Sequence, residues 1–203
     1  MKLVILDRDG TLSQGGAGYI KSADEWQPLP GALQAVAQLN HAGWHVVLAC
    51  NQSGLGRGLF DMTALNAIHA KLHQQLAAQG ARIDAIFFCP HSPDEHCHCR
   101  KPLPGLFEQI GERYGLPLQG VPAVGDSLSD MQAAAAAGCE PHLVLTGKAA
   151  LTYPRLLDSL AQTSSDLQPL RQFAQLPEHL HIHADLTAFA HYLLTREAQG
   201  KAA

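Results

Sequence analysis

The chain has 203 residues, of which 46% are hydrophobic, and a formal net charge of −4 at pH 7. This length and apolar content predict one globular domain over residues 1–203. The negative net charge does not indicate the basic surface that nucleic-acid-binding proteins present. No apolar run approaches the roughly 20 residues of a membrane span, and the first one is too short for a signal peptide. We therefore expect a cytoplasmic protein without nucleic-acid or membrane partners.

The first predicted strand, residues 2–6, is an almost wholly apolar run that is too short for a helix. It ends in Asp7-Arg8-Asp9-Gly10-Thr11, so two carboxylates lie where open α/β sheets bind their ligands. Like charges in a confined site are costly unless a cation or shared proton relieves them, so the pair indicates a divalent metal. The same pattern also occurs in ordinary turns, and only the rest of the chain can decide between the two readings.

Helical patterns and apolar runs alternate from this point to residue 145. Helices are predicted at 32–42, from 61 or 63 to 79, at 104–114 and at 129–137, and strands at 45–50, 83–89, 121–124 and 142–145. This alternation predicts an α/β fold of Rossmann-like type, a doubly wound and mainly parallel sheet with helices on both faces. No insertion is large enough for a cap, so the site is predicted to be capless and to receive its substrate through loops.

The C-terminal part is patterned less clearly. Residues 150–180 form an insertion that we leave unassigned, with a helix-like piece around 156–161. Residues 181–184 predict an edge strand and residues 185–194 a capped helix. Residues 196–203 are predicted to be a frayed tail.

Polar groups follow two further strands. Cys50-Asn51-Gln52-Ser53 leads into a glycine-rich turn, Asp126 follows the strand at 121–124, and Arg100-Lys101 precedes a proline-rich helix start. Carboxylates for a metal, backbone N–H groups at a turn and one lysine are the parts that phosphoryl transfer requires. A carboxylate nucleophile can form an aspartyl-phosphate, which divides one difficult hydrolysis into two steps.

Three of the five cysteines lie close together on a loop at residues 89–101. Cys89-x-His91 and Cys97-x-Cys99 form a Cys₃His set within eleven residues, which suits tetrahedral Zn²⁺. Four ligands leave no open position, so this zinc is predicted to be structural and to fix the loop that carries Arg100 and Lys101. His96 and His98 are rival ligands on the same loop, and the spacing alone does not exclude them.

The chain resembles the haloacid dehalogenase superfamily phosphatases. Residues 7–11 match the first motif of that family, Lys101 the third and residues 125–130 the fourth. Asn51-Gln52-Ser53-Gly54 and the stretch from 89 to 102 resemble the capless branch that contains the D-glycero-D-manno-heptose 1,7-bisphosphate 7-phosphatases and the related histidinol-phosphate phosphatases. The resemblance covers about residues 1–148.

This resemblance implies roles for particular residues. Asp7 would be the nucleophile, Asp9 the acid and then the base, and Lys101 the cation that neutralises the phosphoryl group. Mg²⁺ would be held by Asp7, the backbone carbonyl of Asp9 and Asp126. Zn²⁺ would be held by Cys89, Cys97, Cys99 and, as the favoured histidine, His91. Substrate or phosphate contacts are implied for Arg8, Tyr19, Cys50, Asn51, Gln52, Ser53 and Arg100.

Cys50 departs from the family pattern, which normally has Thr or Ser at this position. A thiol is a weak hydrogen-bond donor, so one contact to the phosphoryl group could be lost. A lone cysteine is more often a small buried hydrophobe.

The resemblance implies a Mg²⁺-dependent phosphatase that removes the 7-phosphate of D-glycero-D-manno-heptose 1,7-bisphosphate through an aspartyl-phosphate, in the biosynthesis of the lipopolysaccharide core. One alternative keeps the mechanism and changes the substrate to histidinol phosphate or another small phosphate ester. An alternative of another class is a catalytically inert, zinc-stabilised binding protein, which only Cys50 favours. We expect a sugar phosphate as the small-molecule partner and, without a cap or an evident interface, a monomer.

Overall fold

The computed structural model describes residues 1–15, 18–154, 177 and 179–202. Six parallel strands form one sheet in the order β3-β2-β1-β4-β5-β6. Their bounds are Lys2–Leu6 (β1), Trp44–Asn51 (β2), Ala85–Cys89 (β3), Pro122–Gly125 (β4), Glu140–Val144 (β5) and His181–His183 (β6). The predicted doubly wound, mainly parallel sheet is confirmed, and the edge strand expected at 181–184 is β6.

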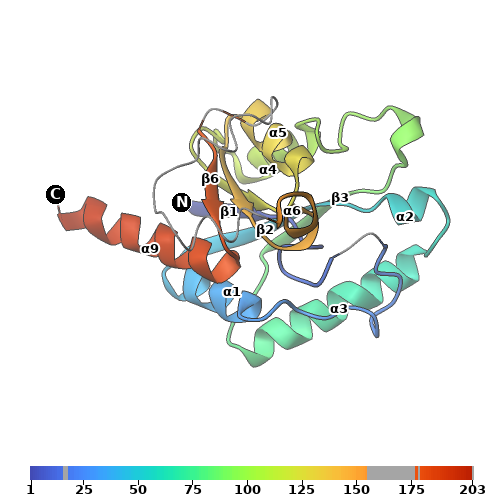
Figure 1. Ribbon diagram of the computed structural model, residues 1–203, viewed down its shortest axis with the longest axis horizontal. Coiled ribbons are helices and arrows are strands. Elements are labelled where there is room, and N and C mark those ends of the chain that lie inside the picture. Colours follow the sequence, from blue (N-terminus) through green and yellow to red (C-terminus); the bar gives the residue numbers. More distant parts are fainter. Residues whose placement is uncertain (16–17, 155–176, 178, 203) are drawn as a thin grey trace.

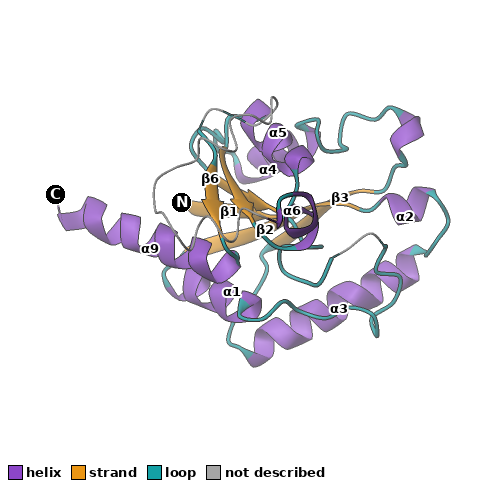
Figure 2. Ribbon diagram, viewed as in Figure 1, coloured by secondary structure: helices purple, strands orange, loops and turns teal. Residues whose placement is uncertain are grey.

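Helices cover both faces of the sheet (Figures 1 and 2). Figure 2 shows α4 and α5 on one face and α1, α3 and α9 on the other. The helices are Ala32–His41 (α1), Ser53–Gly56 (α2), Met62–Ala78 (α3), Gly105–Tyr114 (α4), Leu128–Ala136 (α5), Gly147–Thr152 (α6) and Leu186–Ala202 (α9), with a 3₁₀ turn at Pro93–Glu95 (η1). In the part of the chain described here, every helix is too short or too polar to cross a bilayer.

The packing of β1 explains why its residues are apolar at every position and do not alternate with polar ones. Val4 and Leu6 pack in the core cluster that contains residues of α1, α3 and α9. Leu3 and Ile5 point to the other face and pack with residues of α4 and α5. Because successive side chains of a strand point to opposite faces, a sheet covered on both sides needs apolar residues at every position.

The carboxyl end of β1 lies at the centre of the sheet edge. Its neighbours are β2 and β4, with Leu6 in register with Leu48 on one side and Val124 on the other. The backbone N–H of Asp7 donates to the carbonyl of Val124 at 2.8 Å. The chain winds outward from β1 to β3 and then returns to β4, so this point is the topological switch of the sheet.

Residues 196–203 were expected to be a frayed tail, but residues 196–202 continue α9, and residue 203 lies outside the described part of the chain. Long-range ion pairs fix this helix where local sequence gives little help. Arg196 donates from Nη1 and Nη2 to Glu140 at 2.5 and 2.9 Å, and Lys2 forms an ion pair with Glu197. The helix-like piece expected around 156–161 lies outside the described residues.

A histidine cluster joins β5, β6 and α9. The His142 ring stacks on those of His181 and His183, with centroids 4.8 and 5.3 Å away, and its Nδ1 lies 3.0 Å from Nε2 of His183. Tyr192 and Phe189 of α9 contact the same rings. His142 and His183 are buried core residues and occur in no metal-binding group among the described residues.

Candidate active site

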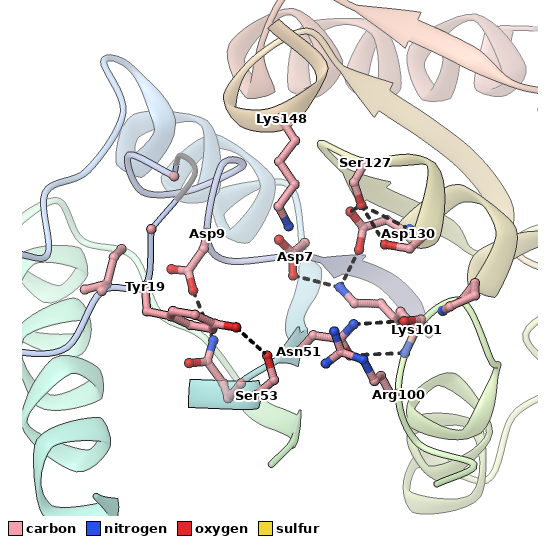
Figure 3. A pocket seen from close by; sticks show the side chains of 16 residues that line it. Asp7, Asp9, Tyr19, Asn51, Ser53, Arg100, Lys101, Ser127, Asp130 and Lys148 are labelled. Atoms are coloured by element: carbon pink, nitrogen blue, oxygen red, sulfur yellow. Dashed lines mark hydrogen bonds and ion pairs between the residues drawn. The ribbon is translucent and has the colours of Figure 1, made fainter. Parts of the chain in front are cut away.

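A pocket opens at the carboxyl edge of the sheet (Figure 3). Its lining comes from the residues after β1, the end of β2 with the start of α2, the loop before α4, the first turn of α5, and α6. The residues that line it are Asp7, Asp9, Gly15, Gly18, Tyr19, Ile20, Asn51, Gln52, Ser53, Arg100, Lys101, Pro102, Ser127, Ser129, Asp130 and Lys148. The fold therefore brings most of the site residues predicted from the sequence to one place.

Lys101 is the buried cation of this pocket. Its ammonium donates to Asp7 at 2.7 Å and to the carbonyl of Ala49 at 2.7 Å, and it pairs with Asp130 at 2.5 Å. Burial alone would favour the neutral amine, but the charges of Asp130 and Asp7 raise the pKa of Lys101 above its ordinary value. The side chain is therefore a fixed positive charge beside the carboxylate of Asp7.

Asp7, Asp126 and Asp130 form a buried acidic group whose ligand oxygens lie within 4.8 Å of one another. Burial, together with the neighbouring carboxylates, raises the pKa of Asp7 to about 6 and that of Asp126 to about 7. The Oδ2 atom of Asp126 accepts from the backbone N–H of Lys148 at 2.6 Å, whereas its Oδ1 is buried without a partner among the described residues.

An unpaired buried carboxylate oxygen is costly, and hard divalent cations prefer oxygen ligands. The acidic group therefore fits Mg²⁺.

Asp9 is held by several donors. Arg8 donates to it from Nε and Nη2 at 2.8 and 2.7 Å, Gln52 at 3.0 Å and Ser13 at 3.1 Å. Burial would raise the pKa of Asp9, but the charge and hydrogen bonds of Arg8 hold it below the ordinary value.

Arg8 itself is fully buried, reaches His69 of α3 and does not line the pocket. The guanidinium of Arg8 thus orients Asp9 and does not face the pocket, so a side-chain contact from Arg8 to the substrate has no support in the geometry.

Cys50 also lies outside the pocket lining. Its thiol is buried in the core cluster beside α3, and burial raises its pKa to about 12. The next residue of β2, Asn51, points the other way and forms a reciprocal pair with the backbone of Lys101 at 3.0 and 3.1 Å. The alternation of the strand thus makes Cys50 a packing residue and gives Asn51 the position at the site.

Tyr19 and Arg100 lie at more open positions of the pocket (Figure 3). The hydroxyl of Tyr19 lies 3.2 Å from Oγ of Ser53, and the guanidinium of Arg57 lies over its ring at 6.0 Å. Arg100 donates to the carbonyl of His91 at 3.4 Å. These side chains offer donors to a ligand at some distance from the buried Asp7 and Lys101.

The loop before Arg100 brings four metal-ligating side chains together. Sγ of Cys89 lies 3.5 Å from Cys97 and 3.6 Å from Nδ1 of His91, and Cys99 lies 3.3 Å from His91 and 3.6 Å from Cys97. A tetrahedron with ordinary Zn–S and Zn–N bonds has edges of about 3.5 to 3.8 Å, so the set fits zinc.

His96 and His98 do not join this group, and His98 pairs with Glu108 at 2.7 Å. The structure thus selects His91 from the three histidines of the loop.

Two site residues were given no role from the sequence. Asp130 pairs with Lys101 and accepts from Ser127 at 2.5 Å, and Lys148 lines the pocket from α6. Asp130 could have been found from its spacing of four residues after Asp126. Ser127 caps α5, and the first turn of that helix brings Asp130 back toward the end of β4.

Comparison with known proteins identifies the class. The family described as "Polynucleotide kinase 3 phosphatase" matches residues 2–127, and the family described as "HAD-hydrolase-like" matches residues 98–163. D-glycero-beta-D-manno-heptose-1,7-bisphosphate 7-phosphatase of Bordetella bronchiseptica is 54% identical over 194 residues, covering 96% of this chain and 98% of the relative. The protein of the same name from Pseudomonas aeruginosa is 46% identical over 172 residues, covering 81% and 97%.

A solved structure gives the same picture. The crystal structure of D,D-heptose 1,7-bisphosphate phosphatase from B. bronchiseptica, complexed with magnesium and phosphate, has a TM-score of 0.83 at 53% identity, covering 97% of this chain and 99% of the other. Fold and site together define a haloacid dehalogenase-like phosphatase, an enzyme that hydrolyses phosphoric monoesters. Within that class, the chain belongs to the family of D-glycero-β-D-manno-heptose-1,7-bisphosphate 7-phosphatases. The alternative of an inert binding protein is not supported.

Proposed function

We propose that this enzyme removes the 7-phosphate of D-glycero-β-D-manno-heptose 1,7-bisphosphate in the biosynthesis of the lipopolysaccharide core. One observation carries the proposal: Asp7, Asp9, Lys101 and Asp126 converge in a chain that is 54% identical, over 96% of its length, to a relative named for this reaction. The substrate and the residue roles below are parts of this proposal.

Asp7 is the nucleophile. Its carboxylate oxygen attacks phosphorus, the bond from phosphorus to the sugar oxygen breaks, and that oxygen takes a proton from Asp9. For this step Asp9 has to carry a proton in the substrate complex, although Arg8 lowers its pKa in the free enzyme. Asp9 then removes a proton from water as the water attacks the aspartyl-phosphate and frees Asp7. Lys101, 2.7 Å from Asp7, holds positive charge beside the transferring group throughout.

Magnesium fits the acidic group beside the nucleophile. The residues that would hold it are Asp7, Asp126 and the backbone carbonyl of Asp9, and the ion would supply charge neutralisation and orientation of the phosphoryl group. The unpartnered Oδ1 of Asp126 and the raised pKa of Asp7 support this assignment. Asp130 is less suited as a ligand because it already pairs with Lys101 and Ser127.

Zinc would occupy the site formed by Cys89, His91, Cys97 and Cys99, which has no open position. The next two residues are Arg100 and Lys101, so the metal would hold the loop that delivers both cations. Monomeric assembly and a cytoplasmic location complete the proposal, and light scattering and cell fractionation test them.

The deciding assay measures phosphate release with Mg²⁺ from three substrates: heptose 1,7-bisphosphate, histidinol phosphate and a 3′-phosphorylated oligonucleotide. Asp7→Asn serves as the blank. Preference for the bisphosphate is the expected result. Preference for histidinol phosphate would keep the mechanism and change the substrate, and release from the oligonucleotide would favour the activity named by the family that matches residues 2–127. No release above the blank would refute the proposal.

A further inference from the structure

The guanidinium of Arg8 makes three contacts, and only two of them go to Asp9. Its Nε and Nη2 donate to the two carboxylate oxygens of Asp9 at 2.8 and 2.7 Å, which is the bidentate geometry that arginine forms with carboxylates. Its Nη1 lies 3.1 Å from Nε2 of His69, which is 61 residues further along the chain. The side chain of Arg8 is wholly buried, so bulk water cannot replace any of these partners. The orientation of Asp9 therefore depends on a contact that lies outside the loop after β1.

His69 is the acceptor in this contact and is therefore neutral. Every nitrogen of a guanidinium carries hydrogen and none of them accepts, so Nε2 of His69 has to supply the lone pair and hold no proton. Partial burial and the charge of Arg8 lower the pKa of His69 to about 4, in agreement with this assignment. The imidazole thus stays an acceptor at neutral pH and places no second positive charge beside Arg8.

Helix α3 holds His69 in a fixed place. Ile68, the residue before it, is fully buried in the core cluster under the helix. The imidazole ring packs edge-on against Phe88 of β3, with ring centroids 6.4 Å apart. The ammonium of Lys71 donates to the carbonyl of Trp26 at 2.9 Å, so the same helix also anchors the chain that follows β1. A group carried by a packed helix keeps its position more closely than one carried by a loop.

The position of Asp9 matters because its carboxylate has to meet two reacting groups in turn, the leaving oxygen of the sugar and then the attacking water. Asp9 lines the pocket together with Asp7 (Figure 3). A displacement of about 1 Å in such a group can cost on the order of 10²-fold in rate. Gln52 and Ser13 also donate to Asp9, at 3.0 and 3.1 Å, so a change at Arg8 should displace the carboxylate only partly.

We infer that His69 is a positioning residue of this enzyme, which fixes the guanidinium of Arg8 and, through it, the acid–base carboxylate of Asp9. This inference rests on the proposed function, because the acid–base role of Asp9 is taken from it. His69 itself does not line the pocket and touches no reacting atom. Its loss should therefore weaken proton transfer by Asp9 and leave the binding of the phosphoryl group intact.

The test uses two substrates that differ in their need for an acid. The sugar alcohol of heptose 1,7-bisphosphate is a poor leaving group unless it is protonated, whereas the p-nitrophenolate of p-nitrophenyl phosphate leaves without a proton. The ratio kcat/KM covers only the steps up to departure of the leaving group, so it reports the acid role of Asp9 and not its later role as a base.

His69→Leu is expected to lower kcat/KM about 10-fold for heptose 1,7-bisphosphate and by less than about twofold for p-nitrophenyl phosphate. His69→Gln should keep most of the wild-type value on both, because the amide oxygen of glutamine can accept from Arg8 at a similar reach. His73→Leu is the matched control, since His73 lies one turn further along α3 and is exposed, and neither ratio should change in it. Circular dichroism checks that all three variants are folded.

The outcomes separate the inference from the proposed function. A loss that is confined to the heptose substrate and recovered in His69→Gln supports the inference. An equal loss on both substrates, or no loss on either, overturns the inference and leaves the proposed function standing. If the wild type prefers histidinol phosphate, the proposed substrate is wrong, and the same comparison with that ester decides the inference because its leaving group is also an alcohol. If the wild type releases no phosphate above the Asp7→Asn blank, both fail.

Discussion

Replacing His183 with glutamine tests whether the buried histidine cluster makes the fold sensitive to acid. Only 8% of the surface of His183 is exposed, and its Nε2 lies 3.0 Å from Nδ1 of His142. Burial, with the nearby His142 and His181, lowers the pKa of His183 from 6.5 to about 3. Glutamine keeps a hydrogen-bonding amide at a similar reach and does not titrate.

The sign and size of the effect follow from linkage. Below pH 6.5 the unfolded chain takes up a proton at this histidine, whereas the folded chain excludes it until about pH 3. The contribution of neutral His183 to stability is therefore complete above pH 6.5 and is lost progressively as the pH falls toward 3. At about 1.4 kcal/mol for each pH unit, the loss at pH 5 is about 2 kcal/mol.

Urea unfolding at pH 8 and pH 5 measures this loss. The free energy of unfolding of the wild type is expected to fall by about 2 kcal/mol more than that of His183→Gln between these two values. The raised pKa values of Asp7 and Asp126 act in the opposite direction, but they do so in both proteins and cancel in the comparison. Replacing the exposed His41 with glutamine should leave the wild-type dependence intact. Equal pH dependence in wild type and His183→Gln would refute the reasoning.

Three further changes test other parts of the structure. Gly10→Ala should lower kcat on the order of 10²-fold while the circular dichroism spectrum stays native. The reason is that Gly10 has φ +94° and a Cβ there would lie 1.9 Å from Oδ2 of Asp126. Wild-type turnover in this variant would contradict the close approach. Asp61→Ala should lower the free energy of unfolding in urea by about 1 kcal/mol and leave kcat unchanged. The reason is that Asp61 caps α3 by accepting from the N–H of Ala64 at 2.8 Å. An unaltered midpoint of urea unfolding would argue against the cap. Cys97→Ser should reduce the amount of zinc bound to the protein, which native mass spectrometry measures. It should also lower kcat, because the loop that carries Lys101 would be held less firmly. A variant that binds as much zinc as the wild type would show that Cys97 is not a ligand.

The sequence was sufficient for those parts of the site that depend on strand ends and on short spacing. Asp7 and Asp126 follow apolar runs, and parallel strands bring such ends to one edge. The cluster of three cysteines and His91, which could hold a metal ion, was predictable because its four side chains lie within eleven residues. Neither inference required knowledge of a distant contact.

Other features depend on contacts that no local pattern reveals. Arg8 was expected at the substrate, but its side chain turns toward His69, which lies 61 residues away in the chain. Residues 196–203 were expected to be a frayed tail beyond the C-terminal helix, but Arg196 and Glu197 continue that helix and pair with Glu140 and Lys2. Lys148 could not be assigned because its position depends on how α6 packs against Asp126.

The hydrogen bond from Asp7 to Val124 belongs to the central strands of the sheet, where sequence changes are constrained, whereas the loops around the pocket are free of this constraint. Asp7 and Asp126 follow neighbouring central strands and are positioned by their backbone hydrogen bonds, so moving one relative to the other would require strands to unpair. Tyr19, Arg57 and Arg100 lie outside the regular strands and helices, where insertions and substitutions disturb no ladder. The reaction can thus be inherited unchanged while the choice of substrate diverges, which is how one sheet can serve enzymes that act on different phosphate esters.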